Sequence, residues 1–231
     1  MSPDTDRNVV LRGELELAER AGHLFGHARE EFVCAATDLR TWATPGVREQ
    51  IMAGHWQRPP GLRVRKLYTP AALDDEDSER HLVELSRGGA TVRISTAPLP
   101  QETIVIDRKV AVLAGAPVAG VREYTVVRSP GVVRSVRSLY EAAWEAAADL
   151  AEFRRARPPA LGEQSRQILR LLGGGLKDEA AARQLGLSLR TYRRRVAEIL
   201  TLLDADSRFQ AGLRAHELGL LGAPPRRSAA G

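Results

Sequence analysis

Residues 161–221 of the chain read LGEQSRQILRLLGGGLKDEAAARQLGLSLRTYRRRVAEILTLLDADSRFQAGLRAHELGLL. The stretch divides into four segments with helical periodicity, at Glu163–Leu172, Asp178–Leu185, Leu189–Leu203 and Arg208–Leu218. Glycines end the first segment, Gly186-Leu187 forms a turn after the second, and Ser188 and Ser207 offer N-caps for the third and fourth. The two middle segments predict a helix-turn-helix, in which Ala182 is small enough for the helices to cross closely.

The third of these segments is expected to bury one face and to expose the other. Its apolar residues fall on one helical face and are Tyr192, Val196, Ile199, Leu200 and Leu203. Four arginines then lie on the solvent side: Arg190, Arg193, Arg194 and Arg195. Guanidinium groups pair with guanine edges and with phosphates, so the pattern predicts a helix that enters the major groove of DNA. The simpler alternative is a solvated charged face.

Positive charge is concentrated in the same part of the chain. The sequence carries 34 Lys and Arg against 29 Asp and Glu, a formal charge of +5 at pH 7. From Pro158 onward there are 12 basic and 7 acidic residues, whereas the preceding part holds 22 of each. This asymmetry is typical of a polyanion-binding module joined to a neutral partner domain.

From end to end, residues 161–221 resemble the four-helix DNA-binding domain of the LuxR/NarL family of transcription regulators. The shared features are the pattern Ile168, Leu169, Leu172, the Gly175-Leu176 exit, Ala182, Leu185, Leu187-Ser188, Arg190-Thr191 and Gln210-Ala211. The resemblance implies that Arg193, Arg194 and Ala197 face base edges. It places Lys177, Arg190, Thr191 and Arg195 near phosphates. With the cap Ser188, these eight residues are the expected DNA-binding site.

Four positions depart from the family pattern. Lys177 stands where a serine or threonine cap is usual, and Tyr192 stands where a smaller aliphatic residue is usual. Arg195 replaces a frequent histidine, and Asp204 replaces a common glycine. The helix-turn-helix expectation survives these changes, but the preferred base sequence becomes unpredictable.

The amino-terminal part alternates predicted helices and strands, which indicates an α/β domain. An amphipathic helix is expected over Leu11–Phe32, where apolar residues recur at spacings of three and four. Segments rich in apolar and β-branched residues predict strands at Phe32–Thr37, Leu62–Tyr68, Thr91–Thr96, Thr103–Ile106, Val110–Leu113 and Tyr124–Arg128. Further helices are expected at Val47–Ala53 and Asp77–Arg87, the second preceded by a solvated acidic loop, Asp74-Asp75-Glu76-Asp77.

A long helix leads to the expected domain boundary. Ser129-Pro130 supplies an N-cap and a first-turn proline. The helix is predicted to run to about Ala156. Its apolar residues form one stripe and are Val132, Val136, Leu139, Tyr140, Ala143, Trp144, Ala147, Leu150 and Ala151. Pro158-Pro159 then ends it. The expected domains are residues 1–157 and 158–221, followed by a disordered tail at 222–231.

Residues 98–113 read PLPQETIVIDRKVAVL and are similar to the active-site hairpin of the phospholipase D superfamily. That family places a histidine nucleophile, a lysine two residues on, and an aspartate five residues later before a turn. Aligned on Asp107, these positions hold Pro100 and Glu102, which can neither attack a phosphodiester nor attract a phosphate. The resemblance implies a mixed sheet flanked by helices and no catalytic residues. Degenerate domains of this type sense effectors in TrmB-like regulators, so it also implies a candidate small-molecule effector.

Composition excludes several other classes of protein. With 43% hydrophobic and 27% charged residues the chain is neither low-complexity nor wholly disordered. The single cysteine, Cys34, excludes an internal disulfide framework and a cysteine-built zinc site. His23 and His27 are spaced as metal ligands can be, but no third ligand is evident near them, so we expect no metal. We also expect no cofactor. The absence of a long apolar run and of a signal-peptide pattern predicts a cytoplasmic protein without a membrane partner.

The sequence therefore predicts a dimeric, sequence-specific DNA-binding transcription regulator that is not an enzyme. Double-stranded DNA and a second copy of the chain are its expected partners, and RNA polymerase is a further candidate. The amino-terminal domain either senses an effector or only dimerises the DNA-binding heads. Two alternatives from other classes are a phosphodiesterase of the phospholipase D superfamily and a nucleoid-type or scaffold protein that binds DNA without sequence preference.

Overall fold

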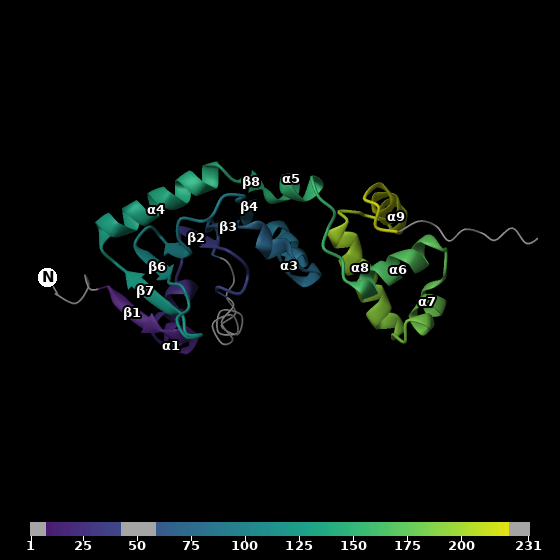
Figure 1. The fold of residues 1–231 in the computed structure, drawn as a ribbon, viewed down its shortest axis with the longest axis horizontal. Coiled ribbons are helices and arrows are strands. Elements are labelled where there is room, and N and C mark those ends of the chain that lie inside the picture. Colours follow the sequence, from purple (N-terminus) through teal and green to yellow (C-terminus); the bar gives the residue numbers. More distant parts are fainter. Residues whose placement is uncertain (1–7, 43–58, 222–231) are drawn as a thin grey trace, which may run out of the picture. The chain divides into compact units, whose positions relative to one another are not determined.

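The computed structural model describes residues 8–42 and 59–221, and it divides into two compact units (Figure 1). One unit contains the described residues up to Ala72 together with Leu85–Phe153. The other contains Leu73–Glu84 together with the residues from Arg154 onward. The helix expected at Val47–Ala53 and the tail expected at 222–231 lie outside the described residues. None of the described helices is long and apolar enough to cross a membrane.

The first unit is built on an eight-stranded mixed sheet with the order β1-β7-β6-β5-β2-β3-β4-β8. Its strands are β1 (Val9–Arg12), β2 (Glu31–Ala36), β3 (Arg63–Tyr68), β4 (Thr91–Ile94), β5 (Thr103–Ile106), β6 (Val110–Ala114), β7 (Glu123–Val127) and β8 (Ala148–Asp149). Strands β2, β3 and β4 pair in parallel, and all other neighbours are antiparallel. The predicted α/β class and all six predicted strands are confirmed.

Helices cover both faces of the sheet (Figure 1). Helix α1 (Gly13–Gly26) packs on the face that carries Cys34, and α4 (Pro130–Glu145) packs on the face that carries Val33. Val33 and Cys34 face opposite sides because successive side chains of a strand alternate. The central strands are therefore buried on both faces, which explains their nearly continuous apolar sequences.

The predicted start of the first helix is wrong, because Val9–Arg12 forms an edge strand instead. Leu11 pairs with Tyr124 of β7 and is 1% exposed. The helix begins at Gly13, whose φ of +76° turns the chain out of the strand. Helical spacing of apolar residues did not reveal this strand, since its pairing partner lies more than a hundred residues away.

The predicted long helix also ends early. Helix α4 stops at Glu145, and Ala148–Asp149 forms β8 against β4 before α5 (Leu150–Arg155) begins. The Asp149 carboxylate accepts a hydrogen bond from the backbone N–H of Ala151 at 2.8 Å, which starts the new helix. The buried stripe likewise differs: Val133 is buried, whereas Val132 is 42% exposed.

The second unit contains four consecutive helices, α6 (Glu163–Gly173), α7 (Asp178–Gln184), α8 (Leu189–Leu202) and α9 (Arg208–Glu217). Each begins at the predicted residue and ends within one residue of the predicted end. They enclose a core of buried residues that includes Ile168, Ala182, Tyr192 and Ile199. The four expected helical segments are thus present.

The second unit also includes most of helix α3 (Glu76–Arg87), which connects the parallel strands β3 and β4 in sequence. Glu79 of α3 is 1% exposed, and its carboxylate accepts hydrogen bonds from Arg154 Nε at 2.8 Å, Arg157 Nη2 at 3.0 Å and Ala160 N at 2.9 Å. The boundary between the units falls between Phe153 and Arg154, four residues before the expected one, and α3 joins the second unit.

The acidic run that precedes α3 is more than a solvated loop. Asp75 caps the helix by accepting a hydrogen bond from Ser78 N at 2.9 Å, which agrees with the expected helix-start role. Glu76, in contrast, accepts hydrogen bonds from Gly162 N at 2.7 Å and from Ser165 Oγ at 2.6 Å, at the start of α6. A side chain of the first half of the sequence therefore caps a helix of the second.

We expect Glu79→Ala to lower the free energy of unfolding of the second unit by about 3 kcal/mol, because it leaves two guanidinium groups without their buried counter-charge. Glu84→Ala is the matched control, since Glu84 is an exposed carboxylate on the same helix. Chemical denaturation followed by circular dichroism measures both. Equal stability of the two variants would contradict the role given to Glu79.

Candidate nucleic-acid interface

Helices α7 and α8 are joined by a tight turn that is held by hydrogen bonds between residues close in sequence. Gly186 has a φ of +66°, and its N–H donates to the carbonyl of Arg183, while Leu187 N donates to Ala182 O. This pair of bonds closes α7 in a Schellman motif, for which glycine is favoured. Ser188 Oγ then caps α8 by accepting from Thr191 N at 3.1 Å. The predicted helix-turn-helix, with its glycine turn and serine cap, is present.

Helix α8 buries the face that the sequence predicts. Tyr192, Val196 and Ile199 are each at most 3% exposed and lie in the core of the second unit. The hydroxyl of Tyr192 is buried without a hydrogen-bond partner among the described residues, and burial raises its pKa. The unusual tyrosine therefore serves as an apolar core residue rather than as part of the exposed surface.

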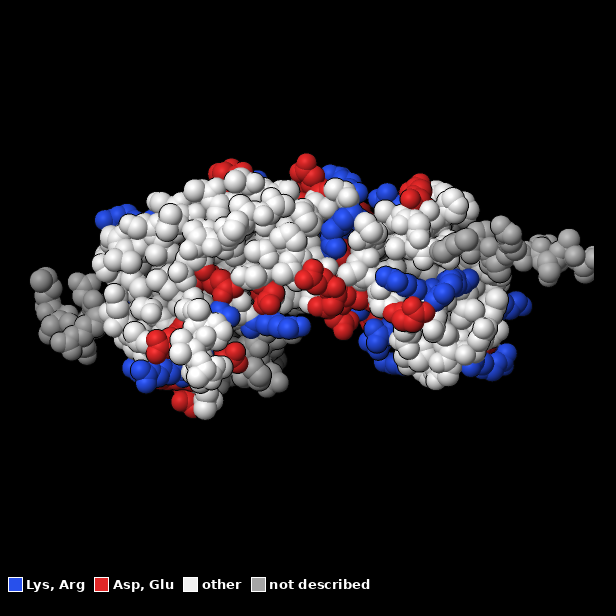
Figure 2. Space-filling view, in the orientation of Figure 1, with Lys and Arg blue, Asp and Glu red and all other residues white. Residues whose placement is uncertain are grey.

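The opposite face of α8 presents arginines to solvent. Arg190, Arg193 and Arg194 are exposed, and Ala197, exposed as well, lies one turn further along the same face. Figure 2 shows basic side chains on the visible face of this unit, with acidic groups among them. Within the described residues, Arg190 forms no ion pair, so its charge is fully available to a ligand.

Arg193 is oriented by a carboxylate of the preceding helix. Its Nε donates to Asp178 at 3.1 Å, and Asp178 also accepts two hydrogen bonds from Arg208 of α9, at 2.6 and 3.0 Å. The hydrogen bond from Arg208, and then that from Arg193, hold the pKa of Asp178 below its ordinary value against the opposing effect of burial. Only Nε of Arg193 is engaged, the side chain is 59% exposed, and its two terminal nitrogens make no hydrogen bond to the described residues.

Arg194 and Arg195 share one carboxylate, that of Glu198. Arg194 Nη1 lies 3.0 Å from one oxygen and Arg195 Nη1 lies 3.0 Å from the other. Arg80 of α3 reaches the second oxygen at 3.5 Å, which places Arg195 on the flank of α8 beside α3. The side chain of Arg195 is 30% exposed, against 62% for Arg194. Arg195 therefore lies apart from the face formed by Arg190, Arg193 and Arg194.

Lys177 occupies the N-cap position of α7 but makes no capping hydrogen bond with its side chain. Its exposed ammonium group lies next to the first turn of α7, where backbone N–H groups are unsatisfied. Of the eight predicted residues, the structure brings Arg190, Arg193, Arg194 and Ala197 onto one face and places Lys177, Ser188 and Thr191 at helix N-termini. Sequence reasoning missed Asp178 and Glu198; helical spacing from Arg194 and Arg195 was an available signal for Glu198, whereas Asp178 lies on α7 and has no such signal.

In the first unit, both carboxylates of the hairpin aligned with a phospholipase D active site are engaged in hydrogen bonds. The carboxylate of Glu102 accepts hydrogen bonds from Thr37 N at 2.7 Å and Thr41 Oγ1 at 2.8 Å, and it pairs with Arg122. Burial alone would raise the pKa of Glu102, but these hydrogen bonds hold it below its ordinary value. The carboxylate of Glu102 is therefore engaged in contacts that hold the fold together.

Asp107 lies at the other end of β5, about 16 Å from Glu102 along an extended strand of this length. Its carboxylate accepts hydrogen bonds from three successive backbone N–H groups, those of Arg29, Glu30 and Glu31, at 2.8–3.1 Å. Burial opposes ionisation, but these bonds outweigh it and lower the pKa of Asp107. At this separation Glu102 and Asp107 cannot act on one substrate atom.

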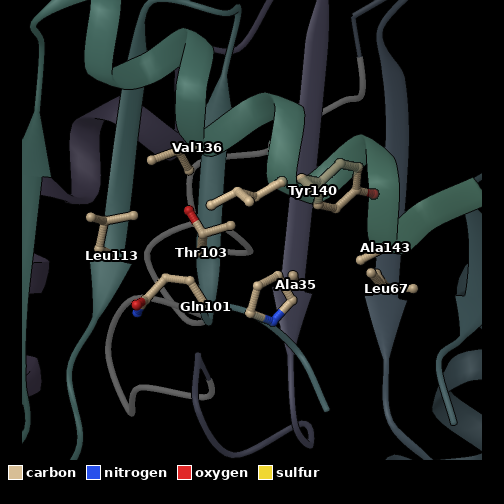
Figure 3. A pocket seen from close by; sticks show the side chains of 10 residues that line it. Ala35, Leu67, Gln101, Thr103, Leu113, Val136, Tyr140 and Ala143 are labelled. Carbon is tan, nitrogen blue, oxygen red and sulfur yellow. The ribbon is translucent and has the colours of Figure 1, made fainter. Parts of the chain in front are cut away.

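A small cavity of about 180 Å³ lies between α4 and the sheet (Figure 3). Its lining residues are Ala35, Leu67, Pro100, Gln101, Thr103, Leu113, Val136, Leu139, Tyr140 and Ala143. Pro100, which stands at the position of the family's nucleophile, is thus part of an almost wholly apolar wall. Among the described residues no group of three or more His, Cys, Asp or Glu side chains is arranged to hold a metal ion.

Comparison with known proteins identifies one relative with a regulatory role. No protein-family model matches the chain. Over 161 residues it is 30% identical to the "Bialaphos biosynthetic pathway regulatory protein" of Streptomyces hygroscopicus, an alignment that covers 70% of this chain and 62% of the relative. The chain thus spans less than two thirds of that protein's length, and it is similar to a regulatory protein.

Two solved structures each match somewhat less than two thirds of this chain. The archaeal chromatin protein TrmBL2 matches 64% of this chain and 56% of its own, with a TM-score of 0.46 and 14% identity. The phospholipase D family member Nuc from Salmonella typhimurium matches 62% of this chain and 98% of its own, with a TM-score of 0.47 and 13% identity. Similarities at these TM-scores are too weak to establish a shared fold.

The uncapped start of α7 generates a prediction with two readouts. We expect Lys177→Ser to stabilise the second unit by about 1 kcal/mol, because serine caps the helix, and to lower the salt dependence of DNA binding by about one counterion. Lys177→Ala is the matched control: it removes the same charge without adding a cap. Thermal unfolding and salt titrations of DNA binding measure the two effects. A stability gain shared by both variants would show that capping is not its cause.

Proposed function

We propose that the protein is a sequence-specific DNA-binding transcription regulator of the LuxR/NarL type, with α8 as its recognition helix. The observation that carries this proposal is the exposed face of α8, which bears Arg190, Arg193 and Arg194. Helix α8 is the second helix of the helix-turn-helix, and Ser188 caps its start. Guanidinium forks on such a helix suit guanine edges in the major groove. The 30% identity with a regulatory protein supports the same role.

The contacts within the second unit support a division of labour among the predicted residues. Arg193 is held by Asp178 with its terminal nitrogens free, so it is pre-oriented for two parallel hydrogen bonds to a base edge. Arg190 and Lys177 lie near helix N-termini, where contacts with phosphates would fix the register of the protein on the DNA duplex. Arg195, half-buried beside Glu198, then serves mainly to position α8.

The proposed regulator acts as a dimer. Two copies place two recognition helices on one duplex and multiply the contacted base pairs. On α9, Phe209 and Leu213 are 82% and 53% exposed and lie four residues apart on one helix face. Exposed apolar pairs of this kind suit contact with a second copy.

The first unit, in this proposal, is not an enzyme and senses a small-molecule effector. Glu102 and Asp107 are both fully engaged in structural hydrogen bonds, and Pro100 lines an apolar cavity. A domain that keeps its sheet and helices without a nucleophile retains concave surfaces in which a ligand can bind.

The recognition role is tested with DNA duplexes selected by the full-length protein from a random pool. We expect Arg193→Ala and Arg194→Ala each to weaken binding to the selected duplex by about 1–3 kcal/mol, because each removes a fork to a base edge, and to change binding to random duplex much less. Fluorescence anisotropy over a range of salt concentrations measures both affinities.

Arg166→Ala is the matched control, because Arg166 is an exposed arginine on α6 of the same unit. It removes the same charge from outside the proposed interface and should affect neither duplex strongly. Equal losses on selected and random duplex for both α8 variants would instead favour the alternative of a DNA-binding protein without sequence preference.

We further expect no hydrolysis of a generic phosphodiester above background, since no nucleophile stands at the hairpin and Glu102 would repel the phosphate. The measurement is release of a chromogenic leaving group from a diester by the purified protein. Turnover that is abolished by Asp107→Asn would favour the alternative of a phosphodiesterase.

A further inference from the structure

The first unit has an open hollow at the edge of the sheet where its parallel strands begin. Glu31, Arg63 and Thr91 are the first residues of β2, β3 and β4, and all three line this hollow. Its other lining residues are Val64, Arg65, Gly89, Arg137 and Glu141, and its volume is about 590 Å³. This volume is within the range of small-molecule binding sites.

The floor of the hollow is a buried carboxylate surrounded by guanidinium groups. The side chain of Glu31 is 3% exposed, and Arg65, Arg108 and Arg137 each donate a hydrogen bond to it at 3.2 Å. Arg63 lies 3.6 Å away. Burial by itself would raise the pKa of Glu31, but the hydrogen bonds from Arg108 and Arg137 hold it below its ordinary value, so the group stays charged.

A second carboxylate joins the cluster from α4. Glu141 accepts hydrogen bonds from Arg65 at 2.6 and 2.8 Å and lies 2.9 Å from Arg137. The hydrogen bonds from Arg65, aided by the charge of Arg137, lower its pKa against the effect of burial. Two ionised carboxylates therefore sit among four guanidinium groups.

In this cluster four guanidinium groups surround two carboxylates. Two arginines would balance two carboxylates, and the remaining two positive charges are uncompensated within it. Asp107 and Lys109 of the adjacent turn offset each other and leave the excess unchanged. Arg63 and Arg108 are 63% and 49% exposed, so their remaining N–H groups are accessible. Positive charge in a concave surface concentrates anions there.

We propose that this hollow binds a small molecule that carries two negative charges on oxyanion groups, such as a phosphate monoester or a dicarboxylate. Guanidinium groups form paired hydrogen bonds with both kinds of oxyanion. Arg63 would contact the anion first, because it lines the hollow and approaches only one carboxylate, at 3.6 Å. Arg137 also lines the hollow but is paired with both Glu31 and Glu141, and Arg65 is held by Glu141 through two bonds.

The position of the hollow links it in sequence to the second unit. Gly89 and Thr91 directly follow α3, the helix whose Glu76 and Glu79 hold the start of the second unit. An anion at this end of α3 would therefore act as the effector of the DNA-binding function. This regulatory part rests on the proposed function, whereas binding of the anion does not.

The binding test uses the full-length protein at low ionic strength and isothermal titration calorimetry with two probes, inorganic phosphate and succinate. We expect saturable binding of at least one probe, which identifies the oxyanion class. Arg63→Ala should weaken that binding by about tenfold. Arg63 is the most exposed arginine of the cluster, so its removal leaves Glu31 with three partners and the fold intact.

Arg134→Ala is the matched control, because Arg134 is an exposed arginine of α4 that does not line the hollow. It should leave probe binding unchanged. Absence of saturable heat with both probes, or an equal loss in the Arg63 and Arg134 variants, would overturn the proposal. So would displacement of the bound probe by random DNA duplex, because the hollow would then be a contact for the DNA backbone.

The regulatory part is measured separately, as the affinity for a selected duplex with and without the bound probe. A change that Arg63→Ala abolishes supports an effector role, and an unchanged affinity overturns that role alone. If the protein binds no DNA either with or without the probe, the proposed function fails while the calorimetric result for the anion still stands.

Discussion

The buried carboxylate of Glu79 is the interaction on which the organisation of this chain depends. It accepts hydrogen bonds from Arg154, Arg157 and the backbone of Ala160, which together lead into α6 of the second unit. A buried carboxylate that loses such partners is strongly unfavourable, so α3 and the start of this unit form one structure. The helix that carries Glu79 is also the connection between two parallel strands of the sheet.

Local signals were sufficient to predict the helix-turn-helix. Gly186 can adopt the left-handed conformation that the turn requires, and Ser188 and Ser207 make the capping hydrogen bonds expected of them. All four helices were located to within one residue at each end because their limits are set by neighbouring residues. By contrast, β1 and β8 exist only through pairing with β7 and β4, distant in sequence. Helical periodicity could not detect either strand.

The exposed face of α8 was predictable from the sequence, but the ion pairs of its arginines were not. The sequence placed the arginines on the outer face of α8, where Arg190, Arg193 and Arg194 are found. It could not indicate that Asp178 orients Arg193, or that Arg80 of α3 approaches Glu198, since these contacts depend on how α3, α7 and α9 pack; the pairing of Arg195 with Glu198, in contrast, is a contact within α8 that helical spacing allows. Pairing with a carboxylate fixes an arginine's rotamer and so reduces the entropy lost on binding. The same pairing weakens its attraction to phosphate, so a held arginine is better suited to reading a base than to neutralising the backbone.

A similar argument distinguishes the two concave surfaces of the first unit. The cavity beside Pro100 is apolar and small, and the packing of α4 on the sheet explains it without a ligand. The hollow around Glu31 differs, because its arginines come from three separate segments, β3, the β5–β6 turn and α4, and no sequence motif unites them. Charge repulsion among four guanidinium groups opposes folding, and two carboxylates relieve only part of it. A fold that maintains such an excess within a concave surface gains stability when an anion occupies it, and that gain is the physical basis on which ligand binding in the first unit can be coupled to its structure.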